Sequence, residues 1–180
     1  MITRPAASRS QPAPNTPVEQ RVLALGLAPR DLALTSQVLA REGIECVACR
    51  TGTELAVEMT RGAGVLLLSE ESLAEGAGAS IAAELAAQPP WSDLPLLVLT
   101  RHGADSLEAQ HATRNLGNVA LLERPIRFAA LVSAVHAALR ARARQYQIRA
   151  HLEERARAEE TRAWLAAIVE NSDEAILGLT

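Results

Sequence analysis

The sequence predicts an α/β fold in which a parallel sheet carries helices on both of its faces. Short apolar runs alternate five times with segments of helical periodicity, which is the pattern of repeated strand–helix units. One run, Val65–Leu68, is continuously apolar, as expected of a central parallel strand covered on both sides. Hydrophobic residues make up 48% of the chain, but many are alanines that bury little area, so the predicted core depends on Leu, Val and Ile.

The first strand is expected at Val22–Leu25, and Gly26 ends it. Pro29 suits the first turn of a helix, and apolar residues then recur at helical spacing up to Gly43, where this helix is expected to end. The second strand is expected directly afterwards, at Ile44–Cys49.

A second helix is expected after the turn at 51–53, with Thr53 as its N-cap residue and Gly62 at its end. The continuous apolar run described above is the third strand. Beyond it, Ile81 and Leu85 mark the inner face of a third helix, and the two prolines that follow end this helix.

The fourth strand is expected at Leu94–Thr100, followed by a weakly patterned helix at 107–116. The fifth strand is expected at Val119–Leu122, and a long helix begins near Arg127. Five strands that alternate with five helices in a domain of this size fit a doubly wound, flavodoxin-like sheet with the strand order 2-1-3-4-5.

The chain divides into four segments. Residues 1–20 are rich in Pro, Ser, Ala and Gln and have little to bury, so a disordered leader is expected there. Residues 21–140 form the predicted α/β domain. Residues 141–163 lack Gly and Pro and are rich in Ala, Arg and Glu, which predicts a helical linker with a weak coiled-coil tendency. Residues 164–180 are expected to begin another domain.

Composition excludes several classes of function. All 18 basic residues are arginines, so no chemistry that needs a lysine amine is available. A net charge of −3 and only four aromatic residues argue against a nucleic-acid partner. No apolar run reaches the roughly 18–20 residues of a membrane-spanning helix, so we expect a cytoplasmic protein. Cys46 and Cys49 fall on opposite faces of one strand, and no metal site is expected there.

Three landmarks of this layout are shared with a known family. Leu99-Thr100 stands where that family has a small or hydroxyl residue at the end of strand four, Arg124-Pro125 stands for its Lys-Pro, and Pro29 lies in the first loop. The run Ala87–Pro95 is similar to the segment that leads into strand four in receivers attached to sensor kinases. Over roughly Arg21–Arg144, the chain therefore resembles the receiver domain of two-component signalling.

A second resemblance lies near the end of the chain. Residues 171–173 are expected to break the helix, and 175–179 have the pattern of a first strand. The run Leu165–Ile176 resembles the opening of a PAS domain. Receiver, helix and PAS in series resemble the front end of a PAS-containing sensor histidine kinase. This resemblance implies PAS and kinase domains downstream in the same chain, with ATP bound only in the kinase core.

The receiver resemblance implies a phosphorylation site whose positions can each be assigned in this sequence. In the family, an acidic pair and an acceptor Asp hold Mg²⁺, and a Lys and a Thr or Ser neutralise the phosphoryl oxygens. The acidic pair falls here on Gly26 and Leu27, and the acceptor position falls on Ser69. The hydroxyl position is kept as Thr100, and the Lys position holds Arg124. These degenerate positions predict a pseudo-receiver that binds no Mg²⁺ and accepts no phosphoryl group.

Two glutamates follow the acceptor position. Glu70 and Glu71 lie at the carboxyl end of the third strand, the edge where open α/β sheets place their ligands. With Thr100 and Arg124 they form a candidate regulatory site, which we call the mouth. One interpretation is a built-in mimic of the phosphorylated state, with either glutamate paired to Arg124. The other is a solvated loop of two carboxylates.

The expected function is that of a regulatory module that is not itself catalytic. The pseudo-receiver would modulate or relay a signal through the helix at 128–169 to a PAS sensor and a histidine kinase core. A homodimer through this helix is the expected assembly, and other signalling proteins are further candidate partners. Two alternatives stay open: a dimerisation and scaffolding module without switching, and an anion or small-molecule binding domain near Ser69, Thr100 and Arg124.

Overall fold

The computed structural model describes residues 17–101, 110 and 114–177. The predicted helix at 107–116 therefore falls mostly outside the described residues, although 110, 114 and 115 are helical. Within the described part of the chain, no helix combines the length and the hydrophobicity needed to cross a membrane.

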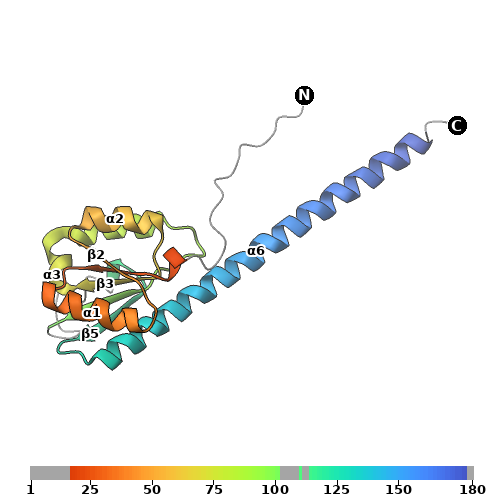
Figure 1. The fold of residues 1–180 in the computed structure, drawn as a ribbon. Helices are drawn as coiled ribbons and strands as arrows, with labels where there is room; N and C mark the ends of the chain where they lie inside the picture. Colours follow the sequence, from red (N-terminus) through yellow and green to blue (C-terminus); the bar gives the residue numbers. More distant parts are fainter. Residues whose placement is uncertain (1–16, 102–109, 111–113, 178–180) are drawn as a thin grey trace.

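Five parallel strands form one sheet in the order β2-β1-β3-β4-β5, which confirms the predicted topology (Figure 1). Their bounds are β1 Val22–Leu25, β2 Cys46–Cys49, β3 Val65–Ser69, β4 Leu96–Thr100 and β5 Val119–Glu123. Side chains of the central strands are almost fully buried, which explains why these strands have continuous apolar sequences.

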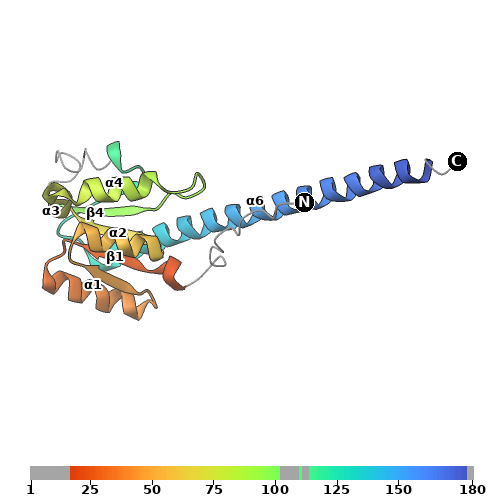
Figure 2. The same cartoon turned by 90° about the horizontal axis from the view of Figure 1, so that it is seen from above.

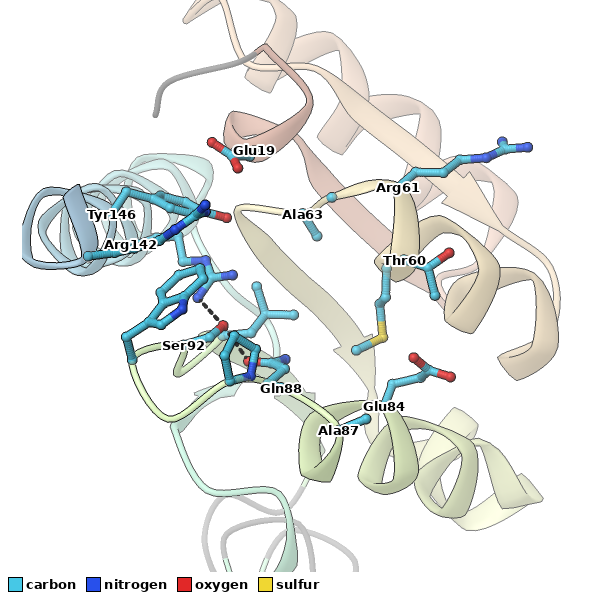
Figure 3. A pocket seen from close by; sticks show the side chains of 16 residues that line it. Glu19, Thr60, Arg61, Ala63, Glu84, Ala87, Gln88, Ser92, Arg142 and Tyr146 are labelled. Atoms are coloured by element: carbon cyan, nitrogen blue, oxygen red, sulfur yellow. Dashed lines mark hydrogen bonds between the residues drawn. The ribbon is translucent and has the colours of Figure 1, made fainter. Parts of the chain in front are cut away.

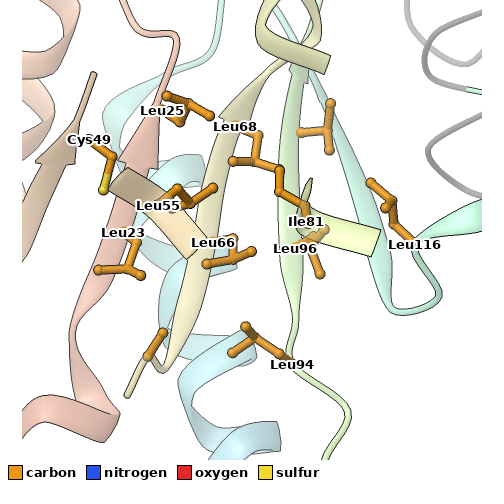
Figure 4. Packing of buried hydrophobic residues seen from close by; sticks show 12 residues of the cluster. Leu23, Leu25, Cys49, Leu55, Leu66, Leu68, Ile81, Leu94, Leu96 and Leu116 are labelled. Carbon is orange, nitrogen blue, oxygen red and sulfur yellow. The ribbon is translucent and has the colours of Figure 1, made fainter. Parts of the chain in front are cut away.

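Helices cover both faces of the sheet. They are α1 Pro29–Arg41, α2 Gly52–Arg61, the three-residue α3 Glu70–Ser72, α4 Gly78–Ala86 and α6 Phe128–Leu177, with an irregular helical segment η2 at Leu73–Ala77. Leu55 of α2 and Ile81 of α4 pack on one face of the sheet (Figure 4). Leu39 of α1 and Leu131 of α6 pack on the other face. The fold is thus the doubly wound one that the sequence predicts.

The two cysteines of β2 follow this division. Cys49 belongs to the cluster under α2 and α4, whereas Cys46 packs against the cluster under α1 and α6. They lie on opposite faces, as predicted, and both thiols are free.

The start of α2 differs from the prediction. The N-cap residue is Thr51 and not Thr53, because Thr51 has an extended backbone and its hydroxyl accepts a hydrogen bond from the N–H of Glu54 at 3.1 Å. Threonine is a favourable N-cap residue at either position, but only Thr51, which precedes the first helical turn, can reach the free N–H groups of that turn.

The predicted leader ends earlier than expected. Residues Pro17–Gln20 form a 3-10 helix, η1, and Glu19 is buried, so the prediction of disorder through residue 20 is wrong for these four residues. Gly64 allows this packing. A Cβ atom at Gly64 would lie 2.7 Å from the carbonyl oxygen of Glu19 and 2.5 Å from Leu139 Cδ2.

Helix α6 extends far beyond the sheet (Figures 1 and 2). Its first turns are anchored by Leu131 and Val135, which are 2% and 0% exposed. Further along, Ile148 and Leu152 are 58% and 55% exposed. The helical linker that the sequence predicts is therefore present.

At its far end α6 differs from the prediction. The helix continues to Leu177, so the expected break at 171–173 and the expected strand at 175–179 are wrong for the residues that the structure describes. A strand is stable only beside another strand, and this segment has none next to it in the described sheet. Without Gly or Pro between 128 and 177, the helix propensity of Ala, Leu and Glu prevails.

Candidate functional site

The predicted site positions meet at the carboxyl edge of the sheet. Gly26 and Leu27 follow β1, Ser69 ends β3, Thr100 ends β4, and Arg124 follows β5. The backbone N–H of Arg124 donates to the carbonyl oxygen of Thr100 at 2.8 Å, which ties the last two of these positions together. Parallel strands bring their carboxyl ends to one edge, so the topology alone assembles this group.

Ser69 has a structural role. Its side chain is fully buried, and its hydroxyl accepts a hydrogen bond from the N–H of Ser72 at 3.1 Å, which makes it the N-cap of α3. The hydroxyl of Ser72 donates in return to the carbonyl oxygen of Ser69 at 2.7 Å. The hydroxyl at the acceptor position is therefore engaged inside the protein.

Gly26 faces this capped turn closely. Its φ angle is +78°, and a Cβ atom built on it would lie 2.3 Å from Ser69 Oγ and 2.5 Å from Ser72 Cβ. Both the backbone conformation and the lack of space require glycine here. Any side chain at this position, including a carboxylate, would collide with the two serines.

The two glutamates of the mouth have different partners. Glu71 Oε1 lies 2.7 Å from Arg101 Nε and 3.5 Å from Arg124 Nη1, so the predicted pairing with Arg124 is made by Glu71. Glu70 is buried, and its carboxylate accepts a hydrogen bond from the backbone N–H of Arg101 at 2.9 Å. The loop is thus a bonded network, and Arg101 is at its centre.

Glu71 stays ionised in this network. Burial raises the pKa of its carboxyl, but its own backbone N–H, the charge of Arg124, the hydroxyl of Ser69 and the charge of Arg101 outweigh burial, and the net pKa lies below the ordinary value. The mouth therefore holds a fixed negative charge next to Arg124.

Two buried polar atoms of the mouth lack a hydrogen-bond partner in the described part of the chain. They are Thr100 Oγ1 and Glu71 Oε2. Thr100 is fully buried, so its hydroxyl is not presented at the surface. Unpaired buried oxygens are costly, so the packing of the mouth leaves part of its hydrogen-bonding capacity unsatisfied.

Beside the mouth lies a cavity of about 460 Å³ between α1 and α6. Leu27, Leu99 and Leu131 give it apolar walls, while Arg101 and Arg124 lie at its border. Leu27, which stands at one of the acidic positions of the family pattern, therefore lines an apolar surface.

Two residues of this site were not predicted. Arg101 follows Thr100 directly, so its place at the same edge follows from the strand assignment. Ser72 could have been found from the spacing Ser-Glu-Glu-Ser, because a serine followed by acidic residues is a signal for the start of a helix.

No known family model matches the chain, and no curated protein matches it. Solved structures do. One is a CheY-like response regulator receiver domain protein from Methanospirillum hungatei JF-1, with 18% identity and a TM-score of 0.59 over 70% of this chain and 98% of that one. Another is the signal receiver domain of a putative LuxO repressor protein from Vibrio parahaemolyticus, with 19% identity and a TM-score of 0.57, covering 72% and 96%.

A third similar structure is a fusion that carries the trimeric coiled coil of yeast Spc42. It has 18% identity and a TM-score of 0.57, and it covers 81% of this chain and 95% of that chain. At these identities the comparisons establish the fold. The chain has the architecture of a receiver domain, followed by a long helix.

Proposed function

We propose that this chain is a regulatory module of two-component signalling whose receiver-like domain accepts no phosphoryl group. The observation that supports this most directly is the packing of Gly26 against Ser69 and Ser72, which occupies the space where the family pattern needs carboxylates. The buried N-cap role of Ser69 supports the same conclusion, because a hydroxyl without a base is a poor nucleophile.

The residues of the mouth do not fit Mg²⁺. This ion prefers carboxylate and water oxygens in octahedral geometry. Gly26 and Leu27 offer no carboxylate, Glu71 is bonded to two arginines, and the Glu70 carboxylate accepts from a backbone N–H.

The pair of Glu71 and Arg124 supports a second part of the proposal. A carboxylate already lies beside the position that would meet a phosphoryl group, so the domain would be held in one state by its own charge. The signal would then leave the domain through α6, whose first turns pack on the sheet. PAS and histidine kinase domains downstream, and a homodimer through α6, complete the proposal.

A titration with a phosphoryl analogue tests the central claim. The chain is mixed with Mg²⁺ and beryllofluoride, which imitates a phosphorylated aspartate, and the backbone amide signals of Gly26, Ser69 and Thr100 are followed by NMR. We expect no shift that depends on both reagents. The control is the same titration without Mg²⁺. A saturable Mg²⁺-dependent shift at these amides would overturn the proposal.

One observation favours a second candidate, a small-molecule binding domain. It is the cavity of about 460 Å³ bordered by Arg101 and Arg124. Its volume lies within the range of roughly 300–1,000 Å³ that is usual for ligand sites. Titration with phosphate in the absence of Mg²⁺ separates the two, because a saturable shift that Arg124→Gln abolishes would favour the binding domain.

A further inference from the structure

The cavity of about 460 Å³ between α1 and α6 has mostly apolar walls. Leu99 and Leu131 belong to the core and are 6% and 2% exposed, so they form a firm base. Six of the lining residues are large apolar side chains, namely Leu27, Leu34, Leu99, Ile126, Phe128 and Leu131. Mostly apolar walls with a few polar groups are the usual lining of a small-molecule site.

Two of these apolar side chains are exposed to solvent. Leu34 of α1 is 37% exposed and Phe128, the first residue of α6, is 46% exposed. Within residues 17–101, 110 and 114–144, Val57 is the only other large hydrophobic side chain classed as exposed, and it lies elsewhere, on α2. The exposed apolar side chains of the domain therefore gather at this cavity, as they do at binding surfaces.

The charges next to the cavity balance one another. Arg101 and Arg124, which line it, both pair with Glu71, and the Glu70 carboxylate accepts from the backbone N–H of Arg101. Two positive charges thus meet two negative ones, and the remaining lining charge, Asp31, is exposed to water. A charged ligand would lose hydration among apolar walls without finding an unpaired opposite charge on a buried group, so the cavity favours a neutral ligand.

A second cavity, of about 360 Å³, lies at the opposite, amino edge of the sheet and has a different character (Figure 3). Arg142, which lines it, is 7% exposed, and its Nη1 donates to Ser92 Oγ and to Gln145 Oε1, each at 2.7 Å. Its guanidinium also forms a hydrogen bond with the side chain of Tyr146. These bonds dock α6 on the segment before β4, so the fold itself explains the polar lining of this second cavity.

We propose that the cavity between α1 and α6 binds a small, neutral, apolar molecule. A closed cavity of about 150 Å³ holds benzene, so this larger and more open one has room for a bicyclic aromatic molecule. The ligand would contact Leu34 on α1 and Phe128 and Leu131 on α6, and would thereby bridge the two helices.

This inference rests on the proposed function in one respect. A receiver-like domain that accepts no phosphoryl group needs another input, and a ligand held against the first turns of α6 would supply it. The ligand adds contacts at the place where α6 begins, so its binding energy can shift the position of that helix.

The probes are indole, which is neutral and bicyclic, and indole-2-carboxylate, which carries a charge directly on the ring system. The backbone amide signals of Leu27, Leu99 and Ile126 are followed by NMR. We expect a saturable shift with indole, and binding of the carboxylate that is about fivefold or more weaker, because its charge would lie among apolar walls. The amides of Trp91 and Leu94, at the second cavity, should not shift.

Two variants with matched exposure complete the test. Phe128→Gln removes apolar surface from the cavity and should weaken indole binding about fivefold or more. Val57→Gln changes a side chain that is 49% exposed and does not line the cavity, so it should leave binding unchanged. The thermal transition shows that each variant is folded, and the comparison of the two probes needs no variant.

Four results would overturn the inference. They are the lack of a saturable shift up to the solubility of indole, equal or tighter binding of the carboxylate, shifts centred on Trp91 and Leu94, and binding by folded Phe128→Gln that is as strong as binding by Val57→Gln. None of them bears on the proposed function, which fails instead on a Mg²⁺-dependent response to beryllofluoride.

Discussion

Gly26 shows how a single residue decides the chemistry of the mouth. Its φ of +78° is the left-handed conformation, and Ser69 and Ser72, at the two ends of the capped turn, fill the space beside it. Gly43 has almost the same φ angle, +73°, but a Cβ atom placed there would have no neighbour within 4 Å. A comparison of the two positions therefore distinguishes the cost of backbone strain from the cost of steric overlap.

We predict that Gly26→Ala lowers the free energy of unfolding by about 2–4 kcal/mol, because it adds steric overlap to the strain of a positive φ. Gly43→Ala should lower it by only about 1 kcal/mol, since the strain acts alone. Urea denaturation of both variants measures the difference. Equal losses of unfolding free energy in the two variants would show that Ser69 and Ser72 leave room for a side chain at position 26.

Glu71 gives a prediction that depends on pH. The folded-state pKa of its carboxyl is lowered from the ordinary 4.5, so its ionised form stabilises the fold above that value, and this stability is lost as the pH falls through the folded pKa. Glu71→Gln should therefore be less stable than the wild type at pH 7, and the two should converge below pH 4.5.

Denaturation at several pH values measures this convergence. Glu75→Gln is the control, because Glu75 is exposed and takes part in no ion pair among the described residues. It should follow the wild type at every pH. A difference between the wild type and Glu71→Gln that is constant from pH 7 down to pH 3 would contradict the ionic role of Glu71.

At the residue scale, sequence reasoning identified the positions of the mouth but not their bonds. Ser69, Thr100 and Arg124 could be placed because strands end there and parallel strands share an edge. Pairing of a glutamate with Arg124 was one of two interpretations, but the choice of Glu71 over Glu70 and the second partner Arg101 depend on side-chain orientation and could not be placed. Arg142 was missed altogether, since its burial depends on a loop about 50 residues away in sequence.

At the scale of elements, α6 combines a packed part with an exposed part. Leu131 is 2% exposed in the core beneath it, whereas Leu152 is 55% exposed beyond the domain. Leu131→Ala should lower the free energy of unfolding by about 2–5 kcal/mol because it leaves a cavity. Leu152→Ala should change it by less than about 0.5 kcal/mol at protein concentrations where the chain is monomeric.

Chemical denaturation of the two variants makes this comparison with the same substitution in the same helix. Comparable losses would mean that residues around Leu152 pack against the domain, contrary to the structure.

Elements were predictable where packing and local preference agree. The central strands β1 and β3 were found because their side chains are buried on both faces, and α1 and α2 because their inner faces recur at helical spacing. The end of α6 was predicted wrongly because the short pattern at 175–179 fits a strand only when a neighbouring strand is present.

At the scale of the whole molecule, the exposed side chains of α6 bear on assembly. Ile148 and Leu152 are one helical turn apart on the part of α6 beyond the sheet. If the proposed homodimer forms through this face, two charges introduced there should prevent it, because they would be buried without partners.

We therefore expect the chain to associate in a concentration-dependent way in analytical ultracentrifugation, and Ile148→Glu/Leu152→Glu to remain monomeric. Gln147→Glu/His151→Glu is the matched control, since it places two glutamates at the same spacing on exposed positions of the same helix. Association that survives the first double variant, or that is lost equally in the control, would contradict dimerisation through this face.

The topology of the whole sheet followed from the sequence with few assumptions. Alternating strands and helices limit the connections to right-handed crossovers, and a five-stranded doubly wound sheet then has few arrangements. What the topology cannot supply is the exit direction of α6. That direction is fixed by contacts such as those of Arg142 and Gln145 with Ser92 and Asp93.

These contacts have a mechanical consequence. From Tyr146 to Leu177, α6 extends for roughly 30 residues, or about 45 Å at about 1.5 Å per residue. For a rigid lever of this length, a tilt of about 5° at its base displaces the tip by about 4 Å. The far end of the helix therefore moves several times farther than the atoms near Arg142, so a small change in these contacts at the base becomes a large displacement at the tip.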